Sequence, residues 1–97
     1  MFSVKQEMVI LEMEKLSFLQ KEDLTRFSIQ QLPPKKAILL HRYYYLHKTD
    51  KVIGESKTFH ATSHVIFRRR KEIHQELSEI MMDNFLNARG FNADRTQ

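Results

Sequence analysis

The chain has no cysteine and no tryptophan, and its 97 residues include only two glycines and two prolines. Without cysteine there is no disulfide, no thiolate zinc site and no cysteine nucleophile, which fits a reducing compartment. So few glycines and prolines argue against a turn-rich all-β fold and against a collagen-like chain. Hydrophobic residues make up 41% and charged residues 29%, a composition that suits one small folded domain.

Long apolar runs are also missing. No stretch approaches the roughly 20 residues that a membrane-spanning helix needs. The first residues of the chain lack the basic start and apolar core of a signal peptide. We therefore expect a cytoplasmic protein with no membrane partner.

Motifs for catalysis and metal binding are equally scarce. The sequence has no glycine-rich phosphate loop, no Gly-x-Ser-x-Gly and no His-Glu-x-x-His. His60 and His64 have the spacing of two metal ligands on one helical face, but no cysteine completes the set, and His60 is expected in a turn. The expectation is a protein without enzyme activity, metal or cofactor.

Positive charge is concentrated in the middle of the chain. The formal net charge is +4, yet residues 35–75 alone carry ten basic and three acidic groups, while both flanking segments are slightly acidic. All five histidines also lie in this stretch. A localised basic surface favours a polyanionic partner such as nucleic acid, and the alternative is an ordinary solvated face.

Apolar residues recur at helical spacing and predict an all-α fold, a small four- to five-helix domain containing a helix-turn-helix with a long C-terminal helix. The predicted helices cover residues 1–20, 35–47, 48–57 and about 62–89, with 21–31 either a short helix or an irregular connection. The helix over 35–47 is apolar on most sides, so we expect it to be central, with its three tyrosines in the core rather than acting as base-stacking platforms.

Local signals place the helix ends. Ser3 is a candidate N-cap, as are Thr49 or Asp50 for the short helix and Thr62 or Ser63 for the last one. Prolines 33 and 34 predict the start of the central helix, and Gly90 predicts the end of the last. The chain then divides into an N-terminal helical segment packing on the core (1–31), a helix-turn-helix domain (32–90) and a flexible tail (91–97).

The segments 49–57 and 62–75 have the form of a helix-turn-helix, a short helix and a second helix joined by a three- to four-residue turn. Gly54 lies in the short helix, where glycine costs about 1 kcal/mol relative to alanine. A close approach between the two helices would explain its presence. The alternative is that Gly54 simply ends the short helix.

The second helix continues into a basic run, Arg68-Arg69-Arg70-Lys71. At about 100° per residue these four side chains cannot all face one duplex. Arg68 and Lys71 share with His64 a face of the helix opposite Ile66 and Ile73. We assign that face to the major groove or its phosphates. Arg69 and Arg70 are expected at the edge, bonding phosphate or an acidic partner.

The motif Leu32-Pro33-Pro34, an apolar helix containing Arg42-Tyr43, and the helix-turn-helix over 50–73 together resemble the region-four domain of bacterial sigma factors and its small phage relatives. The closing part is similar to the phage ArpU-type transcriptional regulators, and the resemblance covers roughly residues 32–80. Lys57 departs from the family pattern, which usually has an apolar residue there, and neither glycine nor asparagine marks the turn.

The resemblance implies a sequence-specific regulator of transcription, encoded by a phage or mobile element, that binds double-stranded DNA and contacts RNA polymerase. It places the recognition residues in the helix that begins near residue 62. With the two edge arginines added, the candidate DNA-binding residues are Thr62, Ser63, His64, Phe67, Arg68, Arg69, Arg70 and Lys71.

A competing hypothesis is a small protein-binding module that docks on a host protein without binding DNA, using its first and last helices. A homodimer is compatible with either function. The candidate dimer residues are Met81, Met82, Phe85 and Leu86, and the alternative is that they cover the first helix within one chain.

Overall fold

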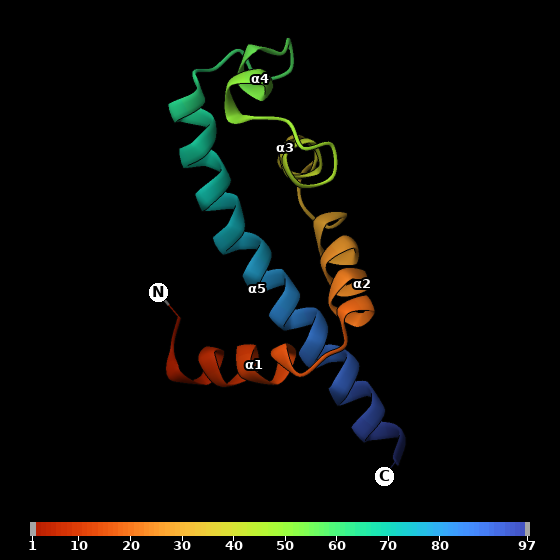
Figure 1. Ribbon diagram of the computed structural model, residues 1–97. Helices are drawn as coiled ribbons and strands as arrows, with labels where there is room; N and C mark the ends of the chain where they lie inside the picture. The colour runs from red at the N-terminus through yellow and green to blue at the C-terminus, as the bar shows by residue number, and fades with distance from the viewer. Residues whose placement is uncertain (1, 97) are drawn as a thin grey trace.

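The structure is a computed structural model that describes the backbone of residues 2–96 and the side chains of residues 2–88. Over this range the chain forms helices and no strand, in the order α1 (Val4–Glu14), α2 (Phe18–Ile29), α3 (Pro34–Tyr44), α4 (Asp50–Glu55) and α5 (Ser63–Thr96). Helix α5 is a single long rod; α2, α3 and α4 lie along one side of it, and α1 crosses it toward its C-terminal end (Figure 1). The predicted all-α fold with a long C-terminal helix is confirmed.

The single helix predicted over residues 1–20 is wrong, because the chain leaves helical geometry between α1 and α2. Each of these helices begins with a capping box. The Ser17 hydroxyl accepts from the Gln20 backbone N–H at 3.2 Å, and the Gln20 side chain accepts from the Ser17 N–H at 2.9 Å. The capping box that begins α2 is therefore favoured over a continuation of α1 through the same residues. The segment 21–31 belongs mostly to α2, which settles its two alternatives in favour of a helix.

Helix α3 begins at the predicted prolines and ends at Tyr44, three residues earlier than expected. The chain turns away through His47, whose φ of 55° lies in the left-handed region. Of the three tyrosines, Tyr43 and Tyr45 pack against the core as predicted. Tyr44 differs, with 41% of its surface exposed.

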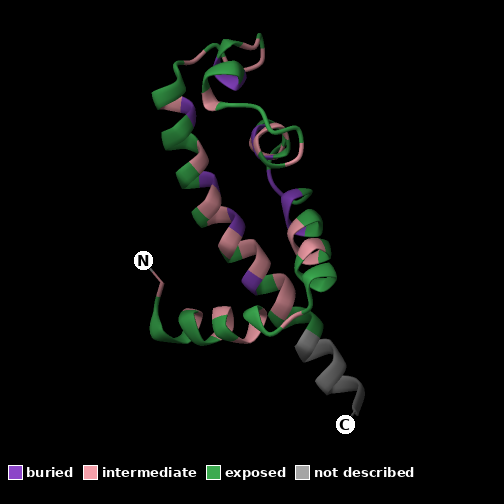
Figure 2. Ribbon diagram, in the orientation of Figure 1, coloured by how far each residue is buried: buried purple, intermediate pink, exposed green. Residues whose placement is uncertain are grey.

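The core runs along the side of α5 that faces the other helices (Figure 2). Leu39, Leu40, Ile53 and Ile66 are at most 1% exposed and join α3, α4 and α5. Burying one such side chain contributes roughly 1.5–3 kcal/mol to stability. The first half of α5 is therefore held rigidly against α3 and α4.

The N-terminal helices are attached to the second half of α5. Asn84 donates from Nδ2 to the buried Ser28 hydroxyl at 3.0 Å, which ties α2 to α5. Of the candidate dimer residues, Met82 is 4% exposed, and Phe85 and Leu86 line a shallow hollow together with Val9 of α1. Part of this set therefore contacts α1 within one chain, while Leu86 keeps 42% of its surface exposed. The homodimer stays a prediction.

The backbone of α5 continues past Gly90, where the sequence predicted its end, to Thr96. The predicted flexible tail at 91–97 falls outside the residues whose side chains the structure describes. Within the described residues, none of the helices combines the length and apolar content that crossing a membrane requires.

Candidate nucleic-acid interface

Helices α4 and α5 pack through their apolar faces in a helix-turn-helix arrangement, and Gly54 is buried between Ala61 of the connection and Ile66 of α5. A Cβ atom added at Gly54 would lie 2.1 Å from the Ala61 carbonyl oxygen and 3.2 Å from Ile66 Cγ1. The Ala61 N–H donates to the Gly54 carbonyl at 2.8 Å. A close approach at Gly54 is present as predicted, but its tightest partner is the backbone of the connection, and α5 contributes only the Ile66 side chain.

The connection between the two helices is longer than predicted. Helix α4 ends at Glu55, two residues early, and residues 56–62 lead into α5. The Ser56 hydroxyl donates to the Ile53 carbonyl at 2.7 Å and accepts from Arg42 Nη1 at 3.2 Å. His60 adopts φ 45°, so a histidine takes the left-handed turn position that glycine or asparagine usually occupies.

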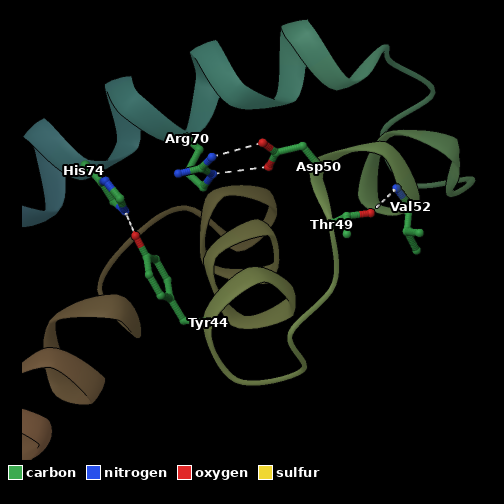
Figure 3. A network of polar contacts seen from close by, with 6 residues as sticks. All are labelled: Tyr44, Thr49, Asp50, Val52, Arg70 and His74. Atoms are coloured by element: carbon green, nitrogen blue, oxygen red, sulfur yellow. Dashed lines mark hydrogen bonds and ion pairs between the residues drawn. The ribbon is translucent and has the colours of Figure 1, made fainter.

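A polar network fixes the angle between α4 and α5 (Figure 3). Arg70 donates to both carboxylate oxygens of Asp50, from Nη2 at 2.9 Å and from Nε at 3.2 Å. Its guanidinium carbon lies 3.9 Å from the centre of the Tyr43 ring. One side chain of α5 is thus joined to α4 by an ion pair and to α3 by a cation–π contact.

Arg70 therefore forms its contacts within the protein and is not presented on the exposed surface of α5. Of the two edge partners predicted for it, phosphate or an acidic group, the structure gives it an acidic one. The hydrogen bond with Asp50 raises the pKa of Arg70 above its usual value, against the opposing effect of burial. Its neighbour Arg69 projects toward α3, where it lines a hollow with Lys35 and Lys36.

The remaining candidates share the solvent-exposed surface at the start of α5. They are Thr62, Ser63, His64, Phe67, Arg68 and Lys71. The Thr62 hydroxyl caps the helix by accepting from the Val65 N–H at 3.3 Å. Phe67 keeps 40% of its surface exposed, with Lys71 Nζ 4.8 Å from the centre of its ring. Imidazole, aromatic and cationic groups are thus collected on one face of α5, and the two hydroxyls lie at its start.

A second contact between α3 and α5 lies one turn further along. The Tyr44 hydroxyl and His74 Nε2 share a hydrogen bond (Figure 3), and the two rings lie 5.4 Å apart. Burial and the positive charge of Arg70 lower the pKa of His74 below its usual 6.5. Burial also raises the pKa of Tyr44. Both groups are therefore held in their neutral forms.

Three features of this region were missed at the level of sequence. The sequence predicts Asp50 only as a candidate N-cap, whereas the structure shows it as the partner of Arg70. Tyr43 is predicted in the core with no cationic neighbour, and Lys35 and Lys36 are predicted only as part of the positive charge of residues 35–75. A single acid near a basic run is a weak signal for such a pair. No local pattern points to the hollow.

Among the described residues, no group of three or more His, Asp or Glu side chains is placed to hold a metal ion. Comparisons of the chain with protein-family models, with curated proteins and with solved structures find no match.

Proposed function

We propose that the protein is a sequence-specific regulator of transcription that binds double-stranded DNA with the first half of α5. One observation carries this proposal. Arg68 and Lys71, together with His64, are exposed on one face of a helix that is fixed on α4 in a helix-turn-helix arrangement. This is the geometry by which a second helix is presented to the major groove.

Each group on this face suits a different part of DNA. Arginine bonds guanine with two hydrogen bonds or a phosphate with its charge, while lysine suits phosphate. The exposed Phe67 ring suits a thymine methyl group, and the hydroxyls of Thr62 and Ser63 suit phosphate at the start of the helix. RNA polymerase, the second partner implied by the sigma-factor resemblance, belongs to the same proposal.

The test is a fluorescence-anisotropy titration of the full chain against a pool of genomic fragments, at several salt concentrations from 50 to 200 mM. Binding that selects particular fragments and weakens by about ten-fold or more over this range is expected, because several phosphates release counterions. Fragments recovered at the highest salt would define the target. No binding at 50 mM salt would overturn the proposal.

A protein-binding module is the second candidate, and an exposed apolar surface favours it. Val4, Met8 and Leu11 lie on the outer side of α1 with 59–75% of their surface exposed, and Phe18 and Leu19 at the start of α2 are similarly open. Apolar faces of this kind are typical of helix docking. Binding to a host protein that persists at high salt and is lost in Met8→Ser with Leu11→Ser, without any DNA binding, would favour this function.

A further inference from the structure

A hollow of about 420 Å³ opens between α3, the connection before α5, and the side of α5 that carries Arg69. Its size falls within the range of small-molecule sites. Arg69 lies about 160° around the helix from Lys71 and about 100° from Arg68. The hollow therefore adjoins the exposed face that carries Arg68 and Lys71, and neither of these two residues lines it.

The hollow has an apolar part and a cationic part. Leu39, Phe59 and Ile73 supply apolar surface from three different segments of the chain, and Lys35, Lys36 and Arg69 supply three positive charges. Leu39 and Ile73 are core residues that are at most 4% exposed, so the apolar wall belongs to the rigid part of the fold.

The positive charges are only partly neutralised. Lys36 donates to Glu76 at 2.6 Å. Among the described residues, Lys35 and Arg69 form no ion pair. Glu72 also lines the hollow, so three cations and two acids leave one net positive charge. That balance suits a monoanion better than a polyphosphate or the backbone of DNA.

We propose that this hollow binds a small organic monoanion, a carboxylate attached to a flat apolar body. Arg69 and Lys35 hold the carboxylate, because a guanidinium and an ammonium without acidic partners are strong donors for it. The apolar body lies against the half-buried Phe59 ring, where it displaces water from apolar surface, and the buried Leu39 and Ile73 side chains form the rigid floor beneath it. The site does not depend on DNA binding, and either property can fail without the other.

The experiment is a ¹H–¹⁵N NMR titration of the full chain with 1-naphthoate as the probe. Saturable shifts are expected at Thr58, Phe59 and Ile73, which line the hollow. The uncharged analogue 1-naphthalenemethanol has the same ring system. We expect its affinity to be lower than that of naphthoate by about ten-fold or more, because it lacks the carboxylate. Inorganic phosphate should leave the Ile73 signal unmoved.

Two neighbouring arginines provide a matched pair of variants. Arg69→Gln should weaken naphthoate binding by about ten-fold, while Arg68→Gln removes the same charge from the exposed DNA face and should change it by less than about two-fold. The proposal is overturned if naphthoate gives no saturable shifts, if the uncharged analogue binds equally well, or if both variants lose binding equally. A folded spectrum for each variant excludes unfolding as the cause.

Discussion

Arg70 and Asp50 form a two-bonded ion pair that joins the long helix α5 to the short helix α4, with donor–acceptor distances of 2.9 and 3.2 Å. Their side chains are only 11% and 18% exposed. Because α4 is six residues long, it is too short to be stable by itself. Its position depends on this pair, on Ile53 and on the close approach at Gly54.

Loss of this pair is expected to destabilise the protein. Asp50→Asn leaves the Arg70 charge largely buried without its partner and should lower the free energy of unfolding by about 2 kcal/mol. Urea denaturation measures the change. Glu76→Gln is the matched control, because its pair with Lys36 is 38–44% exposed and should contribute less than about 1 kcal/mol. Equal losses in the two variants would contradict this role for Asp50.

The exposed cations of α5 are expected to carry DNA affinity. Arg68→Ala combined with Lys71→Ala should abolish fragment-selective binding. The salt slope of the non-selective binding that remains should fall by about two, and circular dichroism should show unchanged helix content. Lys15→Ala with Lys21→Ala removes the same charge from the N-terminal helices and should leave binding intact. Retention of affinity by the first variant would remove both residues from the interface.

Any side chain at Gly54 is expected to disturb the helix-turn-helix. Gly54→Ala would place a Cβ atom 2.1 Å from the Ala61 carbonyl oxygen, so the backbone of the connection must move. A loss of about 2–3 kcal/mol is expected in urea denaturation, and Gly54→Leu should prevent stable folding. Glu55→Ala, at the neighbouring exposed position, should change stability by less than about 0.5 kcal/mol. An unchanged midpoint for Gly54→Ala would refute the close approach.

His60→Gly is expected to stabilise the protein. A non-glycine residue in the left-handed region is strained by roughly 1 kcal/mol, and His60 lies there with φ 45°. The free energy gained by relieving that strain should exceed the entropic cost of a more flexible unfolded chain by about 0.5 kcal/mol. The melting temperature should therefore rise by a few degrees. His41→Gly makes the same substitution inside helix α3. It is a control with the opposite expected effect and should destabilise the protein. A lower melting temperature for His60→Gly would show that its side chain contributes more than its backbone costs.

The stability of the protein is expected to fall in mild acid through His74. Its pKa in the folded state is lowered by burial and by Arg70, so the unfolded chain binds a proton more readily. The contribution of neutral His74 to stability is fully present above about pH 6.5, and it declines as the pH falls toward the pKa of His74 in the folded state. Melting temperatures between pH 7.5 and 5 measure it, and His74→Gln should flatten the slope. An unaltered slope would assign the acid sensitivity to other groups.

Much of the helical pattern could be predicted because it depends on neighbours in the sequence. Apolar spacing places the stripe of Ile66, Ile73 and Leu77 on α5, and Thr49 and Thr62 cap the helices that follow them. The misplaced boundary at Ser17 is instructive, since its capping box with Gln20 is also local. An apolar periodicity that continues across a helix start conceals it, because a long helix and two shorter ones satisfy the same spacing.

The sequence by itself determined the all-α fold, the long last helix and the concentration of positive charge in residues 35–75. The structure decided between the two alternatives for Gly54, because the Ala61 carbonyl oxygen leaves no room for a side chain there. Only the tertiary structure decided how the four consecutive cations of α5 are divided. Arg70 turns to Asp50, which is 20 residues away in the chain, Arg69 joins Lys35 of α3 at the hollow, and Arg68 and Lys71 remain on the exposed face. Helical rotation separates these side chains, but their partners belong to other helices, and only packing brings those helices together.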